Sequence, residues 1–124
     1  MGVEYRAALP LLQEAQQLPS TGRNAGLLAE VIVNLAVVNT RLGYYPQAWI
    51  EFQQAIAILR DLGDPYALIN AEREIGIWLQ YQKRWSEAEK QFDSALKSAR
   101  ELDDAASVRD TLFAKMELYS GLKQ

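Results

Sequence analysis

Apolar residues recur along the chain at spacings of three and four, which is the period of an amphipathic helix, and no stretch alternates as a β-strand would. Helix-breaking residues interrupt this pattern at regular places. The pattern therefore predicts an all-α fold of about six antiparallel helices joined by short links. The expected helices cover residues 4–18, 24–42, 46–62, 65–82, 86–102 and 105–120.

Turn chemistry supports these boundaries. The first break is Pro19-Ser20-Thr21-Gly22, and Gly43 and Gly63 end the next two helices. Asp64 and Asp103-Asp104 are positioned to cap the helices that follow them. Pro10 conflicts with the pattern, because proline removes a backbone donor inside the first helix. We expect that helix either to start late or to kink at Pro10.

The same residue types return every 40 residues, and the copies align without a gap. Fixed-period self-similarity of this length is typical of a stacked helical solenoid. The alanines allow two helix backbones to approach closely, and the large rings fill the space between them, so we expect these positions in the core. The three copies are Tyr5, Ala8, Leu12 and Ala15; Tyr45, Ala48, Phe52 and Ala55; and Trp85, Ala88, Phe92 and Ala95.

Two longer motifs carry a family resemblance. Leu35-Ala36 is followed by Gly43-Tyr44-Tyr45-Pro46-Gln47-Ala48, Phe52 and Ala55, and Ile75-Gly76 is followed by Trp85-Ser86-Glu87-Ala88, Phe92 and Ala95. This pattern resembles the tetratricopeptide repeat (TPR), and the extended 40-residue period is similar to that of kinesin light chains and some bacterial regulators. The resemblance implies a right-handed superhelical solenoid of α-α hairpins. A HEAT or armadillo array, with repeats of about 40–47 residues, is the structural alternative.

The resemblance also divides each repeat into a first-type helix and the second-type helix that follows it. We expect a single TPR-like domain over residues 1–124, with a second-type helix of an incomplete repeat at 4–18, repeats at 24–63 and 64–103, and a capping helix at 104–121. Lys115 replaces Leu35 and Ile75, as suits a cap. The unpaired first helix indicates either a piece of a longer array or pairing with another chain through Leu9, Leu11 and Leu12.

In tetratricopeptide arrays the first-type helices line a concave groove that holds a peptide or a helix. The resemblance implies a groove with apolar anchors and polar orienting groups; the alternative, residue by residue, is that the polar members are simply solvated. Basic residues that would grip a chaperone's terminal carboxylate are replaced by Asn70 and Glu74, which argues against that ligand. The expected partner-binding residues are Asn34, Val37, Arg41, Arg73, Glu74, Ile77, Gln80, Tyr81, Phe113 and Glu117.

Composition excludes several functions. With 13 basic against 16 acidic residues the net charge is −3, which is unfavourable for binding nucleic acid. The chain has no cysteine and no histidine, and it carries no phosphate-binding glycine loop, so we expect no enzymatic activity, no metal and no cofactor. Uninterrupted apolar runs are far shorter than the roughly 20 residues that span a bilayer, so we expect no membrane association and a cytoplasmic location.

Together these observations favour a protein–protein interaction scaffold that binds a peptide or helix of a partner in its concave groove. Two alternatives remain: a regulatory or sensor segment of a larger multidomain bacterial regulator, and a module that self-assembles through its terminal helices. The identity of a partner is not encoded in any motif of the chain.

Overall fold

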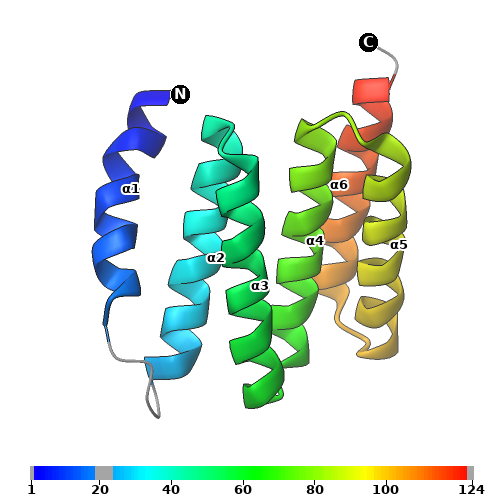
Figure 1. The fold of residues 1–124 in the computed structure, drawn as a ribbon. Coiled ribbons are helices and arrows are strands. Elements are labelled where there is room, and N and C mark those ends of the chain that lie inside the picture. The colour runs from blue at the N-terminus through cyan, green and yellow to red at the C-terminus, as the bar shows by residue number, and fades with distance from the viewer. Residues whose placement is uncertain (1, 19–23, 123–124) are drawn as a thin grey trace. The chain divides into compact units, whose positions relative to one another are not determined.

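The computed structural model describes residues 2–18 and 24–122, and within these residues it contains six α-helices and no β-strand (Figure 1). The all-α prediction is confirmed. The helices are α1 (Gly2–Gln16), α2 (Asn24–Leu42), α3 (Tyr45–Leu62), α4 (Pro65–Tyr81), α5 (Trp85–Glu101) and α6 (Ala105–Leu122).

The helices form two compact units, residues 1–64 and residues 65–124. In unit 1, α2 packs against both α1 and α3; in unit 2, α5 packs against α4 and α6, and α4 also contacts α6. The boundary between the units lies at residues 64/65, one residue after the predicted boundary between the two repeats at 63/64. Organisation as a single domain stays a prediction.

The predicted core is confirmed at the alanines and phenylalanines of the two complete repeats, whereas Tyr45 and Trp85 are only half-buried, and it is wrong in the first helix. The side chain of Tyr5 lies outside the described part of the chain. Ala48, Phe52 and Ala55 of α3 have no exposed surface, and the same is true of their equivalents in α5. In α1, by contrast, Ala8 and Leu12 are only partly buried. The reason is that α1 has no first-type helix of its own repeat within the described residues, whereas α3 packs on α2 and α5 packs on α4 within complete hairpins.

The turns repeat with the same period as the core. Gly43 and Lys83 have φ of 85° and 61°, and Gly63 and Asp103 have φ of 64° and 53°. The residue after Gly43 or Lys83 donates its backbone amide to a carbonyl of the preceding helix. Tyr44 N, for example, bonds to Asn39 O at 2.8 Å. Such left-handed C-caps satisfy the last carbonyls of a helix and favour glycine. The second repeat keeps the geometry with Lys83 and Asp103 in the glycine positions.

Helix boundaries differ slightly from the prediction. α1 begins at Gly2 and runs through Pro10, so a late start after the proline was wrong, and it ends at Gln16 rather than at residue 18. The predicted break at residues 19–22 lies outside the described residues. The other five helices begin and end within two residues of their predicted limits. Asp104 stands at the start of α6 as expected, where its carboxylate accepts a hydrogen bond from Ser107.

Helix α2 has enough length and apolar character to cross a membrane, with a mean hydropathy of 1.4, which the count of uninterrupted apolar runs did not reveal. Core helices of soluble proteins pass the same test. Here the buried side chains of α2, such as Leu35 and Ala36, belong to the packing of unit 1. The absence of membrane association stays a prediction.

Candidate partner-binding faces

Seven of the ten predicted binding residues lie in unit 2, on α4 and on the neighbouring α6. Tyr81 and Phe113 are exposed, and the Phe113 side chain keeps 56% of its surface accessible. Ile77 lies half-buried on α4, four residues before Tyr81. Since residues four apart share one face of a helix, α4 presents Ile77 and Tyr81 together. The remaining members of this set in unit 2 are Arg73, Glu74, Gln80 and Glu117.

Arg73 is held in place by its own helix. Its Nη2 donates a hydrogen bond to Oδ1 of Asn70, one turn earlier. Both residues are half-buried, and the bond restricts the rotamers of the long arginine side chain. The guanidinium keeps further N–H groups for a ligand, because it has five donors in all. Asn70 therefore orients the cation on this face.

The other three predicted binding residues belong to unit 1. On α2, Asn34 and Arg41 are exposed and Val37 is half-buried. The spacing of three and four residues places them on one side of the helix. The structure thus brings together the predicted residues within each unit.

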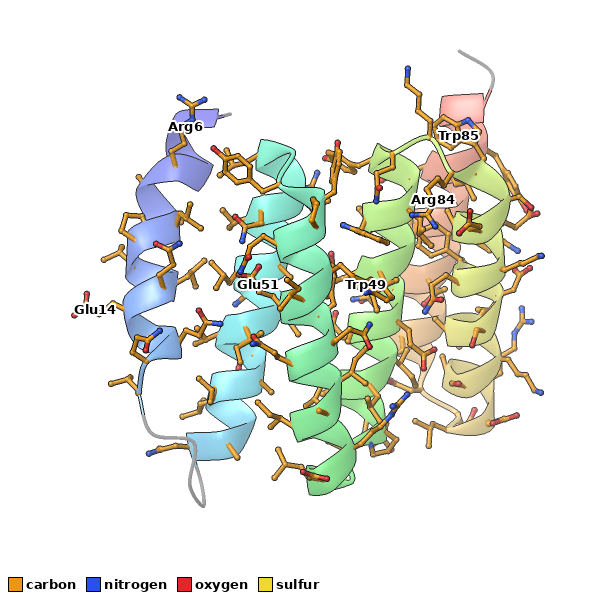
Figure 2. All side chains as sticks on the ribbon, viewed as in Figure 1. Arg6, Glu14, Trp49, Glu51, Arg84 and Trp85 are labelled. Carbon is orange, nitrogen blue, oxygen red and sulfur yellow. The ribbon has the colours of Figure 1, made fainter. Side chains whose placement is uncertain are left out.

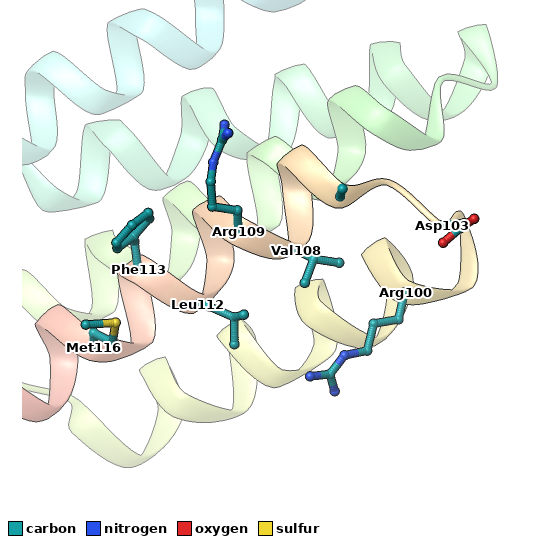
Figure 3. Close-up of a pocket in the computed structure, with 8 residues that line it drawn as sticks. Arg100, Asp103, Val108, Arg109, Leu112, Phe113 and Met116 are labelled. Carbon is teal, nitrogen blue, oxygen red and sulfur yellow. The ribbon is translucent and has the colours of Figure 1, made fainter.

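An apolar hollow on unit 2 was missed by the sequence reasoning. It has a volume of about 570 Å³ and lies along the exposed side of α6, next to the turn from α5 (Figure 3). Leu112 and Met116 project from α6 among the lining side chains, and Arg109 and Arg100 point to opposite sides (Figure 3). A signal was available: Met116 occupies the place of Ala36 and Gly76, both of which are small. The complete lining is Arg100, Asp103, Ala105, Val108, Arg109, Leu112, Phe113 and Met116.

Polar contacts fasten α6 to α5 beside this hollow. Lys115 Nζ pairs with Asp93, and the Tyr119 hydroxyl donates to Glu89. The hydrogen bond to Asp93 raises the pKa of Lys115, and the hydrogen bond to Glu89, together with burial, raises the pKa of Tyr119. The side chain of Lys115 is only 19% exposed. The polar residue expected of a capping helix thus serves as an inter-helix link.

Unit 1 contains a buried polar pair with no counterpart in unit 2. Asn39 of α2 donates a hydrogen bond of 2.7 Å to Oε1 of Glu51, which projects from α3 and is 2% exposed (Figure 2). Gln47 donates to the other carboxylate oxygen at 3.0 Å. The equivalent residues in the second repeat are Leu79 and Gln91. This pair fixes α3 against α2 and is closed to solvent, so we assign it to the core.

The repeat geometry agrees with a comparison of the sequence with known families. The tetratricopeptide repeat family model matches residues 27–101. The chain belongs to the tetratricopeptide repeat family. The match spans both complete repeats, and with the six helices it makes the fold a TPR-like helical-repeat solenoid. No curated protein matches the chain.

Members of this family generally act as protein–protein interaction modules rather than as catalysts. The described residues contain no group of three or more histidine, cysteine, aspartate or glutamate side chains able to hold a metal ion. Absence of enzymatic activity and of nucleic-acid binding in this chain remains a prediction. Likeness to the extended repeats of kinesin light chains stays a resemblance.

Proposed function

We propose that this TPR chain is a protein–protein interaction scaffold whose α4–α6 face binds a peptide or helical segment of a partner. The single observation that carries the proposal is the combination of exposed aromatic rings at Tyr81 and Phe113 with the oriented cation Arg73. Exposed aromatics and arginines are enriched among the residues that dominate binding energy. We further propose that Asn34, Val37 and Arg41, which share one side of α2 in unit 1, also contact a partner.

The chemistry of the face defines the kind of ligand. Ile77, Tyr81 and Phe113 offer apolar contact, and Arg73 offers hydrogen-bond donors to a carboxylate or carbonyl oxygen. Glu74 and Glu117 disfavour a strongly acidic ligand. A segment with apolar or aromatic anchors and few negative charges fits this combination, and cytoplasmic partners are the ones we expect.

The test begins with selection of peptides from a displayed random library against the 124-residue chain. Binding of a selected peptide is then measured by fluorescence anisotropy for the wild type and for Arg73→Glu/Tyr81→Ala. The matched control is Lys90→Glu/Tyr66→Ala, which likewise changes one cation and one tyrosine, at exposed sites outside the predicted set. Circular dichroism verifies that all three chains remain helical.

We expect the face variant to weaken binding by at least about tenfold, which corresponds to the loss of about 1.4 kcal/mol, and the control to bind as the wild type does. Equal binding by the wild type and the face variant would refute the proposal. Equal weakening by the control would do the same, because the effect would then not depend on this face.

A further inference from the structure

The two terminal helices each present an apolar side that no other helix covers within the described residues. Leu11 of α1 is 67% exposed and Met116 of α6 is 61% exposed. Helix α1 is a second-type helix and α6 is a first-type helix, and these are the two types that pair within each unit, as α2 with α3 and α4 with α5. Helices α1 and α6 are therefore of complementary types.

We propose that α6 of one copy of this chain pairs with α1 of a second copy, in the register of the internal α2–α3 and α4–α5 pairs. The 40-residue period then gives the residues that meet, because adding or subtracting the period converts an internal pair into an intermolecular one. Three internal pairs define this register: Gly76 lies against Phe92, Asn39 bonds to Glu51, and Ile69 shares a core cluster with Ala95. Their intermolecular equivalents are Met116 with Leu12, Tyr119 with Leu11, and Arg109 with Ala15.

The first of these pairs exchanges bulk between its two members. Inside unit 2 a glycine at position 76 lies against the Phe92 ring, too close for any side chain. In the proposed pair Met116 is larger than Gly76, and Leu12 is smaller than Phe92. A core accepts substitutions best when the total volume is kept and when the residues remain apolar. The flexible methionine suits such an exchange, since it adapts its shape to the space available.

The second pair replaces a buried polar contact with an apolar one. Asn39 and Glu51 share a hydrogen bond of 2.7 Å in the interior of unit 1. In their places Tyr119 and Leu11 present a ring and an aliphatic side chain. The Tyr119 hydroxyl is already bonded to Glu89 of its own chain, so covering the ring buries no unsatisfied polar atom.

The third pair brings a cation to a helix C-terminus. Ile69 packs against Ala95 in the core of unit 2, and Arg109 stands in its place on α6. The equivalent of Ala95 is Ala15, one residue before α1 ends at Gln16. Helix α1 has no basic residue in its last turn. A cation near the free carbonyls of a last turn is stabilising by about 0.3–1 kcal/mol. In the proposed pair, Arg109 of one copy provides this cation for α1 of the other copy.

A pairing of two different faces is heterologous, so copies add head to tail and form open chains or rings. Because the chain has no cysteine, single cysteines can be placed without background reaction. Leu12→Cys and Met116→Cys are made as separate variants that carry tags of different length. They are mixed and treated with a short bis-maleimide, which links only thiols that lie close together.

We expect a cross-linked heterodimer in the mixture and little homodimer from either variant alone. The matched control replaces Leu12→Cys by Gln53→Cys, an exposed site on α3, and we expect no heterodimer with Met116→Cys. A yield of cross-linked heterodimer no higher than in this control would overturn the proposal. Homodimers of Met116→Cys at comparable yield would overturn it as well, because α6 would then pair with α6.

Sedimentation equilibrium tests the exchange of bulk directly. Met116→Ala and Leu12→Phe each restore one member of the internal Ala36–Phe52 pair. We expect each single variant to weaken association by at least about tenfold and the double variant to recover most of the loss. A wild-type chain that stays monomeric at its highest soluble concentration contradicts the proposed pairing. A double variant whose association is weakened by as much as the two single changes combined contradicts the proposed register.

Discussion

Gly76 of α4 lies against the ring of Phe92 on α5, so closely that a Cβ built at residue 76 would be 2.7 Å from Cδ1 and 2.9 Å from Cζ of the ring. The Phe92 side chain is fully buried. The glycine thus sets the distance between the two helices of this hairpin. Ala36 takes the equivalent position in the first repeat, opposite the equally buried Phe52.

We therefore predict that Gly76→Ala lowers the free energy of unfolding by about 1–2 kcal/mol. Overpacking costs about 1–3 kcal/mol, and the better helix propensity of alanine offsets up to about 1 kcal/mol of this. Urea denaturation followed by circular dichroism measures the change. Gly26→Ala is the control, because the nearest atom to its added Cβ, Leu62 Cδ1, is 3.9 Å away. That control is expected to be neutral or stabilising, and a stabilised Gly76→Ala chain would contradict the close approach.

Pro10 lies inside α1, where it leaves one backbone carbonyl without its helical donor. We predict that Pro10→Ala stabilises α1, because the alanine amide restores this hydrogen bond and removes the ring from the preceding turn. The gain has an upper limit of about 3 kcal/mol. Hydrogen exchange of the α1 amides measures it as slower exchange. Gln13→Ala, at an exposed site of the same helix, should change exchange little, and equal protection in both variants would show that Pro10 does not limit α1.

The 40-residue spacing predicted the helices and most of the core, because a buried face must repeat wherever the same hairpin repeats. Ala88 and Phe92 were assigned correctly for this reason. The same logic failed at Leu12, since the burial of a residue depends on the helix that packs over it as well as on its own type. Equivalent positions are equally buried only where the other helix of the same hairpin is present.

Polar contacts between distant helices were beyond the reach of the pattern. Asn39 and Glu51 are 12 residues apart, and no periodicity of apolar residues indicates that one donates to the other. The candidate binding face was inferred from helical spacing and family resemblance, and the orienting bond from Arg73 to Asn70 became visible only in three dimensions. The departure of Met116 from the small-residue position was readable in the sequence, but its meaning required the packing of Gly76.

The Asn39–Glu51 pair allows a prediction in which the second repeat supplies the replacement. Asn39→Leu leaves the buried Glu51 carboxylate with fewer donors, and we expect a loss of about 2–4 kcal/mol in the free energy of unfolding. Asn39→Leu/Glu51→Gln installs the residue types found at Leu79 and Gln91. The double variant should recover about 1–3 kcal/mol of that loss, a coupling that a double-mutant cycle measures. Strictly additive losses would show that the pair contributes no coupling.

The links between α5 and α6 predict a weakening of the structure at alkaline pH. The pKa of Lys115 is raised above 10.5 by Asp93, and the pKa of Tyr119 is raised above 10.0 by Glu89, so folding stabilises the protonated form of both groups. Their contribution is therefore complete below about pH 10 and is lost as the pH rises through the two elevated pKa values. Asp93 is 55% exposed, and solvent screening limits the Lys115–Asp93 pair to less than about 1 kcal/mol.

Comparison of the wild type with Lys115→Met/Tyr119→Phe isolates this effect from the titration of the other lysines and tyrosines, which both chains share. We expect the wild type to have the higher melting temperature at about pH 8 and the difference to shrink towards about pH 12. Hydrogen exchange of α6 should follow the same course, because the lost links hold this helix to α5. A difference in melting temperature that stays constant over this range would mean that the two side chains stabilise α6 by packing, independently of their protons.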